Sequence, residues 1–311
     1  MYFVMKRISF SLFFLLWLLI WGACNDGQNY PPSPPEVKAV FINGDSLHYI
    51  DVGKGDPVIF VHGSLGDYRT WRAQIDVFAK KYRVIAYSRR YAYPNTQVIN
   101  DTADYTVAPH AKDLAAFIKA LGLGPVHLVG HSYGGFTALI TTIDHPELVR
   151  SLTLGEPPVA SLLDGVRGGD TLVNNFVTKV ILPAADAFRQ DDKEKAVKLF
   201  VQGAWGDSAY FSGFSKADRE IMMDNTLELR GAVFTRNLFP PVFCEDLRKI
   251  KVPVLLLQGD RSSLFSTSIV KQLDRCMDSS ESALVSGSSH GLELENPLEF
   301  NEIVLGFINR L

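Results

Sequence analysis

The chain lacks the features that would point to nucleic acid, a metal cluster or a membrane-spanning helix. Its 311 residues carry a formal net charge of −3 and no basic stripe, which argues against nucleic acid as a partner. There are three cysteines, Cys24, Cys244 and Cys276, and they are not spaced as a metal site. The apolar run Ile8–Trp21 is shorter than the ~20 residues that a spanning helix needs. The 47% hydrophobic content is ample for one α/β domain with an inserted subdomain.

The N-terminus has the composition of an export signal. Lys6 and Arg7 precede the uncharged run Ile8–Trp21, in which Leu and Phe dominate, and small residues follow that run. A basic region, a short apolar stretch and small residues before a polar segment are typical of a secretory signal. This order predicts a signal peptide over residues 1–23.

Cys24 follows the predicted signal directly. The segment Gly22–Cys24 resembles a bacterial lipobox, in which the cysteine becomes lipidated and is the first mature residue, although Trp21 departs from the small aliphatic residue usual there. The resemblance implies an exported lipoprotein, anchored to a membrane and facing the periplasm or the cell exterior. A plain signal peptide and an uncleaved anchor are the alternatives. Residues 24–36 contain Pro31–Pro35, four prolines and a serine, and predict a Pro-rich spacer.

Predicted strands and helices alternate along most of the remaining chain. The segments that predict strands are 37–41, 46–52, 58–61, 83–87, 126–129, 151–154, 252–258 and 283–285. The segments that predict the flanking helices are 68–78, 107–121, 136–143 and 298–311. Alternation of this kind predicts a mostly parallel sheet with helices on both faces.

One long stretch breaks the alternation. Residues 157–243 show no clear strand, whereas helix starts are indicated at Asp191–Glu194 and at Ser215–Asp218. We therefore predict a helical cap over 157–243, inserted into a core made of 37–156 and 244–311. Such an insertion would lie over the carboxyl ends of the strands, where open α/β sheets bind ligands.

A Gly-x-Ser-x-Gly motif follows one of the buried strands. The segment Gly130–Gly135 reads Gly-His-Ser-Tyr-Gly-Gly, between the apolar run Val126–Val129 and the helical pattern Phe136–Ile143. A tight turn between strand and helix needs small residues beside the serine, and it lifts the hydroxyl clear of the sheet at the positive end of a helix. Ser132 is therefore the candidate nucleophile.

A serine nucleophile needs a general base, and one histidine is well placed. His290 lies in a loop between the last predicted strand and the last predicted helix. The elbow's own His131 is expected to point away from the nucleophile and to pack.

Together, the order of elements, the elbow and this late histidine resemble the α/β-hydrolase fold superfamily over Val37–Leu311. The resemblance implies a doubly wound, mostly parallel sheet with a helical cap. It also implies that the loop His62–Gly66 carries part of an oxyanion hole, with the backbone N–H groups of Ser64 and Tyr133 as the pair of donors. His62 itself is expected to hold that loop in shape.

The acid that orients the base has two candidates. In the commonest relatives it follows the strand that here ends at Gln258, but Ser262 stands at the expected position and Asp260 comes two residues early. Glu156 follows the strand 151–154, and some haloalkane dehalogenases of the superfamily carry their acid after that strand. We favour Glu156 because a carboxylate there can reach the base from the neighbouring strand end, and geometry decides the role. Asp260 stays the alternative.

A serine nucleophile narrows the chemistry. Epoxide hydrolases and dehalogenases of this fold need a carboxylate nucleophile, whereas Ser132 attacks an acyl carbon, so a small-molecule ester, lactone, thioester, amide or C–C bond beside a carbonyl fits. The expected mechanism needs no metal or cofactor. Arg89 or Arg90 would hold a substrate carboxylate or lie at the surface. The rival functions are a non-catalytic binding protein of the same fold and an acyltransferase.

Two further expectations concern aromatic residues and cysteines. The aromatic side chains of the predicted cap, which either build its own core or line an acyl pocket, are Trp205, Tyr210, Phe211 and Phe214. Cys244 and Cys276 would be able to pair in an oxidising compartment, but we expect two buried free thiols.

Overall fold

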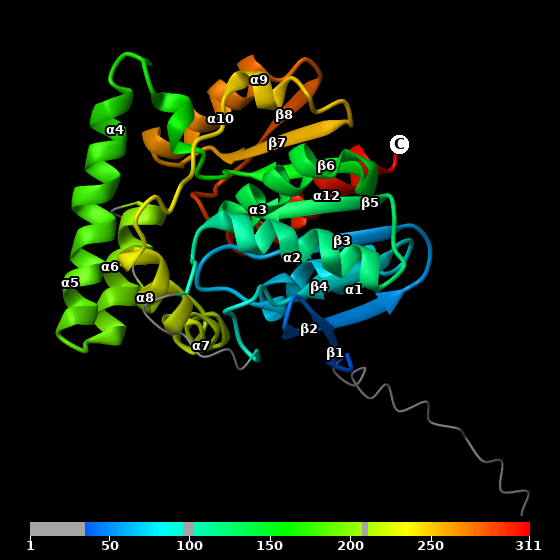
Figure 1. Cartoon of the computed structure of the whole chain (residues 1–311), viewed down its shortest axis with the longest axis horizontal. Helices are drawn as coiled ribbons and strands as arrows, with labels where there is room; N and C mark the ends of the chain where they lie inside the picture. Colours follow the sequence, from blue (N-terminus) through cyan, green and yellow to red (C-terminus); the bar gives the residue numbers. More distant parts are fainter. Residues whose placement is uncertain (1–34, 96–102, 207–210) are drawn as a thin grey trace, which may run out of the picture. The chain divides into compact units, whose positions relative to one another are not determined.

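The computed structural model describes residues 35–95, 103–206 and 211–311 (Figure 1). The predicted signal over 1–23, Cys24, residues 24–34 of the predicted spacer and Tyr210 lie outside these residues. Within the described part of the chain, no helix is both long and apolar enough to cross a membrane.

A mixed sheet forms the centre of the fold, and over the described residues it has eight strands in the order β1-β2-β4-β3-β5-β6-β7-β8. Their bounds are β1 (Lys38–Ile42), β2 (Asp45–Gly53), β3 (Pro57–Val61), β4 (Arg83–Tyr87), β5 (Val126–His131), β6 (Val149–Gly155), β7 (Val254–Gly259) and β8 (Ser280–Val285). The pairs β1–β2 and β2–β4 are antiparallel, and every other neighbouring pair is parallel. The prediction of a mostly parallel sheet is confirmed.

Helices cover both faces of this sheet. In the described residues they are α1 (Arg72–Phe78), α2 (Val107–Ala120), α3 (Ser132–Asp144), α4 (Gly169–Phe176), α5 (Leu182–Arg189), α6 (Lys193–Trp205), α7 (Lys216–Asp224), α8 (Thr226–Phe234), α9 (Cys244–Leu247), α10 (Leu264–Cys276), α11 (Leu292–Glu295) and α12 (Pro297–Ile308). The segment predicted as one helix over 68–78 begins with a 3₁₀ turn, Tyr68–Trp71, before α1.

The two faces follow from the two-residue period of a strand. In β3, Ile59 and Val61 belong to the apolar cluster that packs against α2, α3 and α10, whereas Val58 and Phe60 belong to the cluster that packs against α1 and α12. All four side chains are fully buried. Continuous apolar strands of this kind are what a sheet covered on both faces requires.

The segment 157–243 contains helices α4–α8 and no strand among its described residues (Figure 1). Asp192 caps α6 by accepting from the Lys195 N–H, and Ser215 caps α7 by accepting from the Asp218 N–H. The inward sides of these helices form an apolar cluster of their own. We refer to 157–243 as the helical segment; its role as a cap, with these boundaries, stays a prediction.

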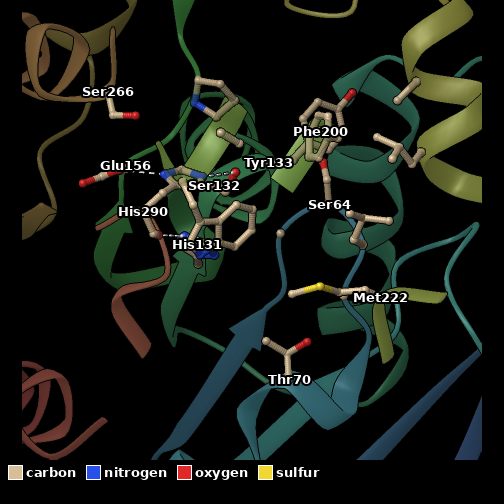
Figure 2. Close-up of a pocket in the computed structure, with 18 of the residues that line it drawn as sticks. Ser64, Thr70, His131, Ser132, Tyr133, Glu156, Phe200, Met222, Ser266 and His290 are labelled. Atoms are coloured by element: carbon tan, nitrogen blue, oxygen red, sulfur yellow. Dashed lines mark hydrogen bonds and ion pairs between the residues drawn. The ribbon is translucent and has the colours of Figure 1, made fainter. Parts of the chain in front are cut away.

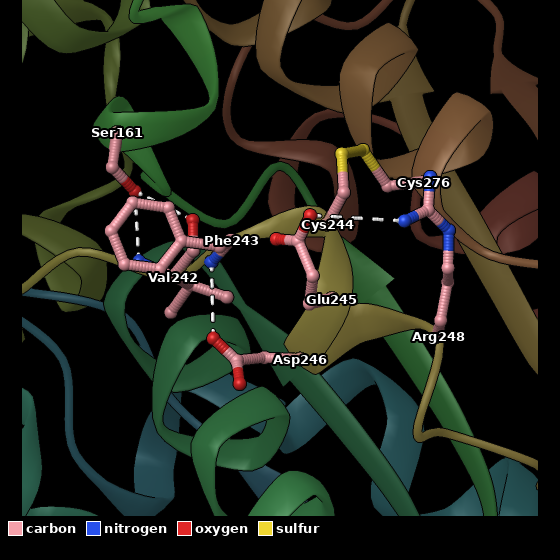
Figure 3. Close-up of a disulfide and its surroundings, with 8 residues drawn as sticks. All are labelled: Ser161, Val242, Phe243, Cys244, Glu245, Asp246, Arg248 and Cys276. Carbon is pink, nitrogen blue, oxygen red and sulfur yellow. Dashed lines mark hydrogen bonds and ion pairs between the residues drawn. A yellow bond between two sulfur atoms is a disulfide. The ribbon is translucent and has the colours of Figure 1, made fainter.

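The expectation of two free thiols is wrong, because Cys244 and Cys276 form a disulfide (Figure 3). Cys244 is the first residue of α9 and Cys276 the last residue of α10, and their Cα atoms lie 4.9 Å apart across 32 positions of sequence. Only the packing of these two helix ends brings the cysteines together, so the sequence by itself did not reveal the pair.

Candidate active site

The Gly-x-Ser-x-Gly segment forms a sharp turn from β5 into α3. Ser132 has a positive φ of 51°, an uncommon conformation for a residue with a side chain. A Cβ on Gly134 would lie 2.2 Å from the Val61 carbonyl oxygen, and one on Gly130 would lie 2.7 Å from the Gly134 carbonyl oxygen. The glycines are therefore required by close backbone approach. The strained serine is held by the turn, as is common where side chains are positioned for function.

Three predicted site residues form one hydrogen-bonded chain (Figure 2). The Oγ of Ser132 lies 2.9 Å from Nε2 of His290, and Nδ1 of His290 lies 2.7 Å from Oε2 of Glu156. His290 lies 134 positions after Glu156 and 158 positions after Ser132 in the sequence. Ser132 follows β5, Glu156 follows β6, and His290 lies in the loop before α11. The arrangement places an imidazole between a hydroxyl and a carboxylate.

Glu156 is the carboxylate that reaches the histidine. It follows β6 with a positive φ of 46°, its backbone N–H donates to the Leu257 carbonyl, and its Oε1 accepts the Gly259 N–H at 2.9 Å. The side chain thus leans from the end of β6 to the end of the neighbouring β7. Burial alone would raise the pKa of Glu156, but the hydrogen bond and the charge of His290 outweigh it, so the pKa is lowered and the carboxylate stays ionised.

Asp260, the alternative acid, lies outside this chain of hydrogen bonds. Its side chain is 43% exposed and accepts a hydrogen bond from the Gly287 N–H at 3.0 Å. Ser262, which stands where an acid was expected, has a buried hydroxyl without a hydrogen bond of standard geometry. That hydroxyl lies close enough to contribute to the lowered pKa of Glu156.

The loop after β3 lies directly against the serine. A Cβ on Gly63 would stand 3.1 Å from the Ser132 Cβ, and Ser64 is half-buried at the edge of the same pocket. His62 holds this loop, as expected: its Nδ1 donates to the Gly63 carbonyl at 2.8 Å, and its Nε2 accepts the Arg89 N–H at 2.9 Å. Burial, followed by the charge of Arg89, lowers the pKa of His62 well below its usual range, so the ring is neutral.

The expectation that an arginine after β4 is free to hold a substrate, or lies at the surface, is wrong. Arg89 is 1% exposed, pairs with Glu228 of α8 at 2.6 Å, and donates to the carbonyls of His62 and Gly63 at 2.9 and 3.1 Å. Arg90 is bound by Asp113 and Asp45, each within 2.8 Å.

Arg89 therefore clamps the loop that carries Ser64 and ties it to the helical segment. Burial raises the pKa of Glu228, and the Arg89 guanidinium opposes that rise. The sequence shows only an arginine beside a strand end, and nothing in it identifies Glu228 as the partner.

His131 does more than pack. Its Nδ1 lies 3.0 Å from Oε1 of Glu293, and its Nε2 lies 2.7 Å from the backbone oxygen of His290. The rings of His131 and His290 are 4.8 Å apart. Burial would lower the pKa of His131, but the charge and hydrogen bond of Glu293 outweigh it and raise the pKa. The only sequence signal for the His131–Glu293 pair is that Glu293 stands three positions after His290, so that it lies close to the candidate base.

A largely apolar pocket opens at the serine, between the core and the helical segment. Its polar lining residues include Ser64, Thr70, Asp218, Ser266 and Glu293. Its larger apolar lining residues are Leu65, Phe176, Ile181, Phe200, Trp205, Ile221, Met222, Leu229, Val233, Leu238, Phe239, Phe265, Ile269 and Leu294. The rings of Phe176 and Phe265 stack with centroids 4.5 Å apart, which joins α4 to α10 at this pocket. Within the described ranges, no group of three or more His, Cys, Asp or Glu side chains is arranged to hold a metal ion.

The aromatic side chains of the helical segment divide between the two expected roles. Trp205 lines the pocket and meets the ring of His290 edge to face, with centroids 5.2 Å apart. Phe214 packs against Trp205, and Phe211 packs against the segment's own apolar cluster. Of Trp205, Phe211 and Phe214, Trp205 lines the pocket, and the two phenylalanines pack within the helical segment.

A family model for the α/β-hydrolase fold matches residues 56–297. The chain belongs to the α/β-hydrolase fold family. One relative is the 2-hydroxy-6-oxo-6-(2'-aminophenyl)hexa-2,4-dienoic acid hydrolase of Metapseudomonas resinovorans. The two sequences are 28% identical over 287 residues, and the match covers 87% of this chain and 90% of that protein. This chain is 26% identical to epoxide hydrolase 3 of Xenopus tropicalis, covering 86% of this chain and 75% of that protein.

Solved structures of other α/β hydrolases have the same fold as this protein. Carboxylesterase CesB from Bacillus subtilis superposes with a TM-score of 0.71 at 22% identity, covering 89% of this chain and 92% of that one. An esterase from Exiguobacterium antarcticum gives a TM-score of 0.72 at 20% identity, covering 88% and 98% of the two chains. At these identities the structural likeness establishes the fold, and the relatives' hydrolase names support hydrolase activity for this chain.

Proposed function

We propose that the protein is a serine hydrolase that cleaves an ester or a related acyl bond of a small molecule. The observation that carries the proposal is the hydrogen-bonded chain from Ser132 through His290 to Glu156, with distances of 2.9 and 2.7 Å. In this proposal His290 removes the proton from the Ser132 hydroxyl, and Glu156 holds the imidazole with Nδ1 protonated. The ionised state of Glu156 at neutral pH, argued above from its lowered pKa, fits that role.

The acyl-transfer steps follow from this geometry. The Ser132 oxygen bonds to the acyl carbon, and the resulting oxyanion is stabilised by the backbone N–H groups of Ser64 and Tyr133. Each such donor is worth about 3 kcal/mol of barrier. His290 then protonates the departing alcohol, leaving an acyl-enzyme. Water, deprotonated by His290, cleaves that ester to release the acid and restore the serine.

The identity of the nucleophile decides between the chemistries of the named relatives. An epoxide opened by a carboxylate leaves an ester that water can hydrolyse, whereas a serine would leave a stable ether. Ser132 therefore disfavours epoxide hydrolysis and favours acyl transfer.

A serine-reactive fluorophosphonate tests the proposal directly. We expect the probe to label the wild type at Ser132 and the wild type to hydrolyse p-nitrophenyl butyrate, and we expect Ser132→Ala to lose both properties. An unlabelled and inactive wild type would instead favour a non-catalytic binding protein. Transfer of the acyl group to an added alcohol in excess of hydrolysis would favour an acyltransferase.

We also propose that the protein is exported and anchored through a lipid on Cys24. Support comes from the basic, apolar and small residues that precede Cys24 and from the Pro-rich residues that follow it. Mass spectrometry of the mature N-terminus tests this proposal. A diacylglycerol-modified Cys24 as the first residue is expected, and an unmodified terminus at another residue would refute it.

A further inference from the structure

The pocket beside Ser132 offers no unpaired cationic side chain among the described residues of its wall. None of the described residues that line it is a lysine or an arginine, and the undescribed internal stretches 96–102 and 207–210 contain neither residue type. Three lining residues, Glu156, Glu293 and Asp218, are acidic. A positively charged His131 would already be paired with Glu293, at 3.0 Å.

Arg89 and Arg72, which lie near the pocket, are each paired with an acidic side chain. Arg89 pairs with Glu228 at 2.6 Å; its Nε and Nη2 also donate to backbone carbonyls of the loop after β3, and its Nη1 lies 3.5 Å from Nδ1 of His110. Arg72 pairs with Asp218 at 2.6 Å. A carboxylate brought into the pocket would therefore find no free cationic partner among the described lining residues.

Most of the remaining lining residues are apolar. Phe200, Leu229 and Val233 of the helical segment line the pocket together with Phe265 and Ile269 of α10. Placing an unpaired carboxylate in such surroundings is strongly unfavourable, because no counter-charge on the described wall compensates for its lost hydration.

We propose that the substrates of this site are uncharged esters with an apolar acyl group, and that acyl groups bearing a carboxylate are rejected. This inference rests on the proposed serine hydrolase function and adds the charge of the substrate to it.

Three p-nitrophenyl esters of defined charge test the inference. They are p-nitrophenyl butyrate, the anionic mono-p-nitrophenyl adipate, and its uncharged methyl ester, methyl p-nitrophenyl adipate. Because the last two share one backbone and differ in charge, their ratio isolates the effect of the carboxylate from that of size. We expect kcat/KM for the methyl ester to exceed that for the anion by about 100-fold or more at pH 7. A ratio within threefold of one, or a preference for the anion, would overturn the inference.

A charge introduced into the wall gives a second, independent test. Met222 of α7 lines the pocket (Figure 2). Its side chain is 4% exposed, and a lysine side chain is unbranched and of similar length. Met222→Lys should raise the relative kcat/KM for the anion over its methyl ester by about tenfold, whereas the uncharged control Met222→Gln should leave that ratio unchanged. An equal change of the ratio in both variants would contradict an electrostatic origin.

The outcomes distinguish failure of the serine hydrolase function from failure of the uncharged-substrate inference. An enzyme that neither turns over the esters nor reacts with the fluorophosphonate would refute the proposed function and the inference with it. An enzyme that is labelled and active on all three esters with similar kcat/KM would leave the serine hydrolase standing and refute the uncharged-substrate inference alone.

A second inference comes from the hydrogen bonds of His131. Its two partners are a Glu293 carboxyl oxygen at 3.0 Å and the His290 backbone oxygen at 2.7 Å. The backbone oxygen accepts, and so does Glu293 when it is ionised, which requires a proton on both ring nitrogens of His131. The charged or titratable groups that contact it are Glu293 and His290, and Glu156 acts on it at longer range. We infer that His131 and Glu293 form a buried ion pair that positions the catalytic base through its backbone.

Single and double replacements separate positioning from charge. His131→Asn should lower kcat by about tenfold to a hundredfold with little change in KM, because the loop of His290 loses its anchor. The same variant leaves Glu293 unpaired beside the base, so the acid limb of the kcat/KM profile should move to higher pH. In the double variant His131→Asn, Glu293→Gln the acid limb should return towards the wild-type position while kcat stays low.

Active sites are counted by fluorophosphonate titration, so that misfolded protein does not enter kcat. A kcat within twofold of the wild type in His131→Asn would refute the positioning role. An acid limb that is the same in the single and double variants would refute the ion pair.

Discussion

Replacing Glu156 by glutamine should disable the base while changing the shape of the site very little. In the structure the Glu156 Oε1 accepts the Gly259 N–H at 2.9 Å, and Oε2 faces Nδ1 of His290 at 2.7 Å. A glutamine that keeps the first bond with its carbonyl presents its NH₂ group to Nδ1. Nδ1 must then accept, the ring proton moves to Nε2, and Nε2 donates to Ser132 instead of accepting its proton.

The magnitude follows from the loss of the correct tautomer. Removal of the orienting carboxylate in a triad lowers kcat by about 10⁴-fold, which corresponds to about 5.4 kcal/mol at 1.36 kcal/mol per factor of ten. KM should change much less, because Glu156 does not hold the substrate in the proposed mechanism. The assay is steady-state hydrolysis of p-nitrophenyl butyrate, with the concentration of the purified protein measured by absorbance and the fold checked by thermal melting.

Asp260→Asn is the matched control. Asp260 is 43% exposed and bonded to the Gly287 N–H, so its replacement should leave kcat within about twofold of the wild type. A Glu156→Gln enzyme with more than a tenth of wild-type kcat, or a collapse of kcat in Asp260→Asn instead, would refute the assignment of the acid.

Three further predictions concern stability. The Cys244–Cys276 bridge closes a loop across 32 positions, so reduction should cost about 3 to 4 kcal/mol of unfolding free energy; thermal melts with and without reductant measure this, and a reductant-insensitive melt would contradict it. Burial, with the charge of Arg150, lowers the pKa of His127 to about 4 in the folded protein. In the unfolded chain this histidine binds a proton below about pH 6.5, whereas in the folded protein it does so only near pH 4. Stability should therefore fall as the pH falls from 6.5 to 4, less steeply in His127→Gln, and equal slopes would count against the argument. Glu228→Ala leaves the buried Arg89 unpaired and should lower the unfolding free energy by about 3 to 5 kcal/mol in urea titrations, whereas a loss below 1 kcal/mol would mean that the pair is not buried in solution.

Much of the site was predictable because strand ends are visible in sequence. The glycines around Ser132 stand between an apolar run and a helical pattern, and only a sharp turn satisfies that order. Glu156 was preferred over Asp260 because parallel strands end at one edge of the sheet, where a neighbouring strand end is within reach of the base. The structure brings Glu156 to His290 at 2.7 Å by leaning its side chain onto Gly259 of the next strand.

The errors about charged side chains share one physical origin. A charged side chain is read from sequence as exposed or substrate-facing, because burial of a charge requires a partner whose position is unknown. Arg89 is buried because Glu228, 139 positions later in the chain, meets it from α8. His131 was assigned to packing because the carboxylate of Glu293 comes from a separate short helix.

Local periodicity and turn chemistry therefore determined the sheet, the elbow and the residues at the strand ends, because these depend on neighbours in the chain. The tertiary structure decided which buried charges pair, that Cys244 and Cys276 meet, and that the described residues of the pocket wall include no free cation. Each of these depends on contacts between segments distant in sequence, and such contacts exist only once the helices have packed against the sheet and against one another.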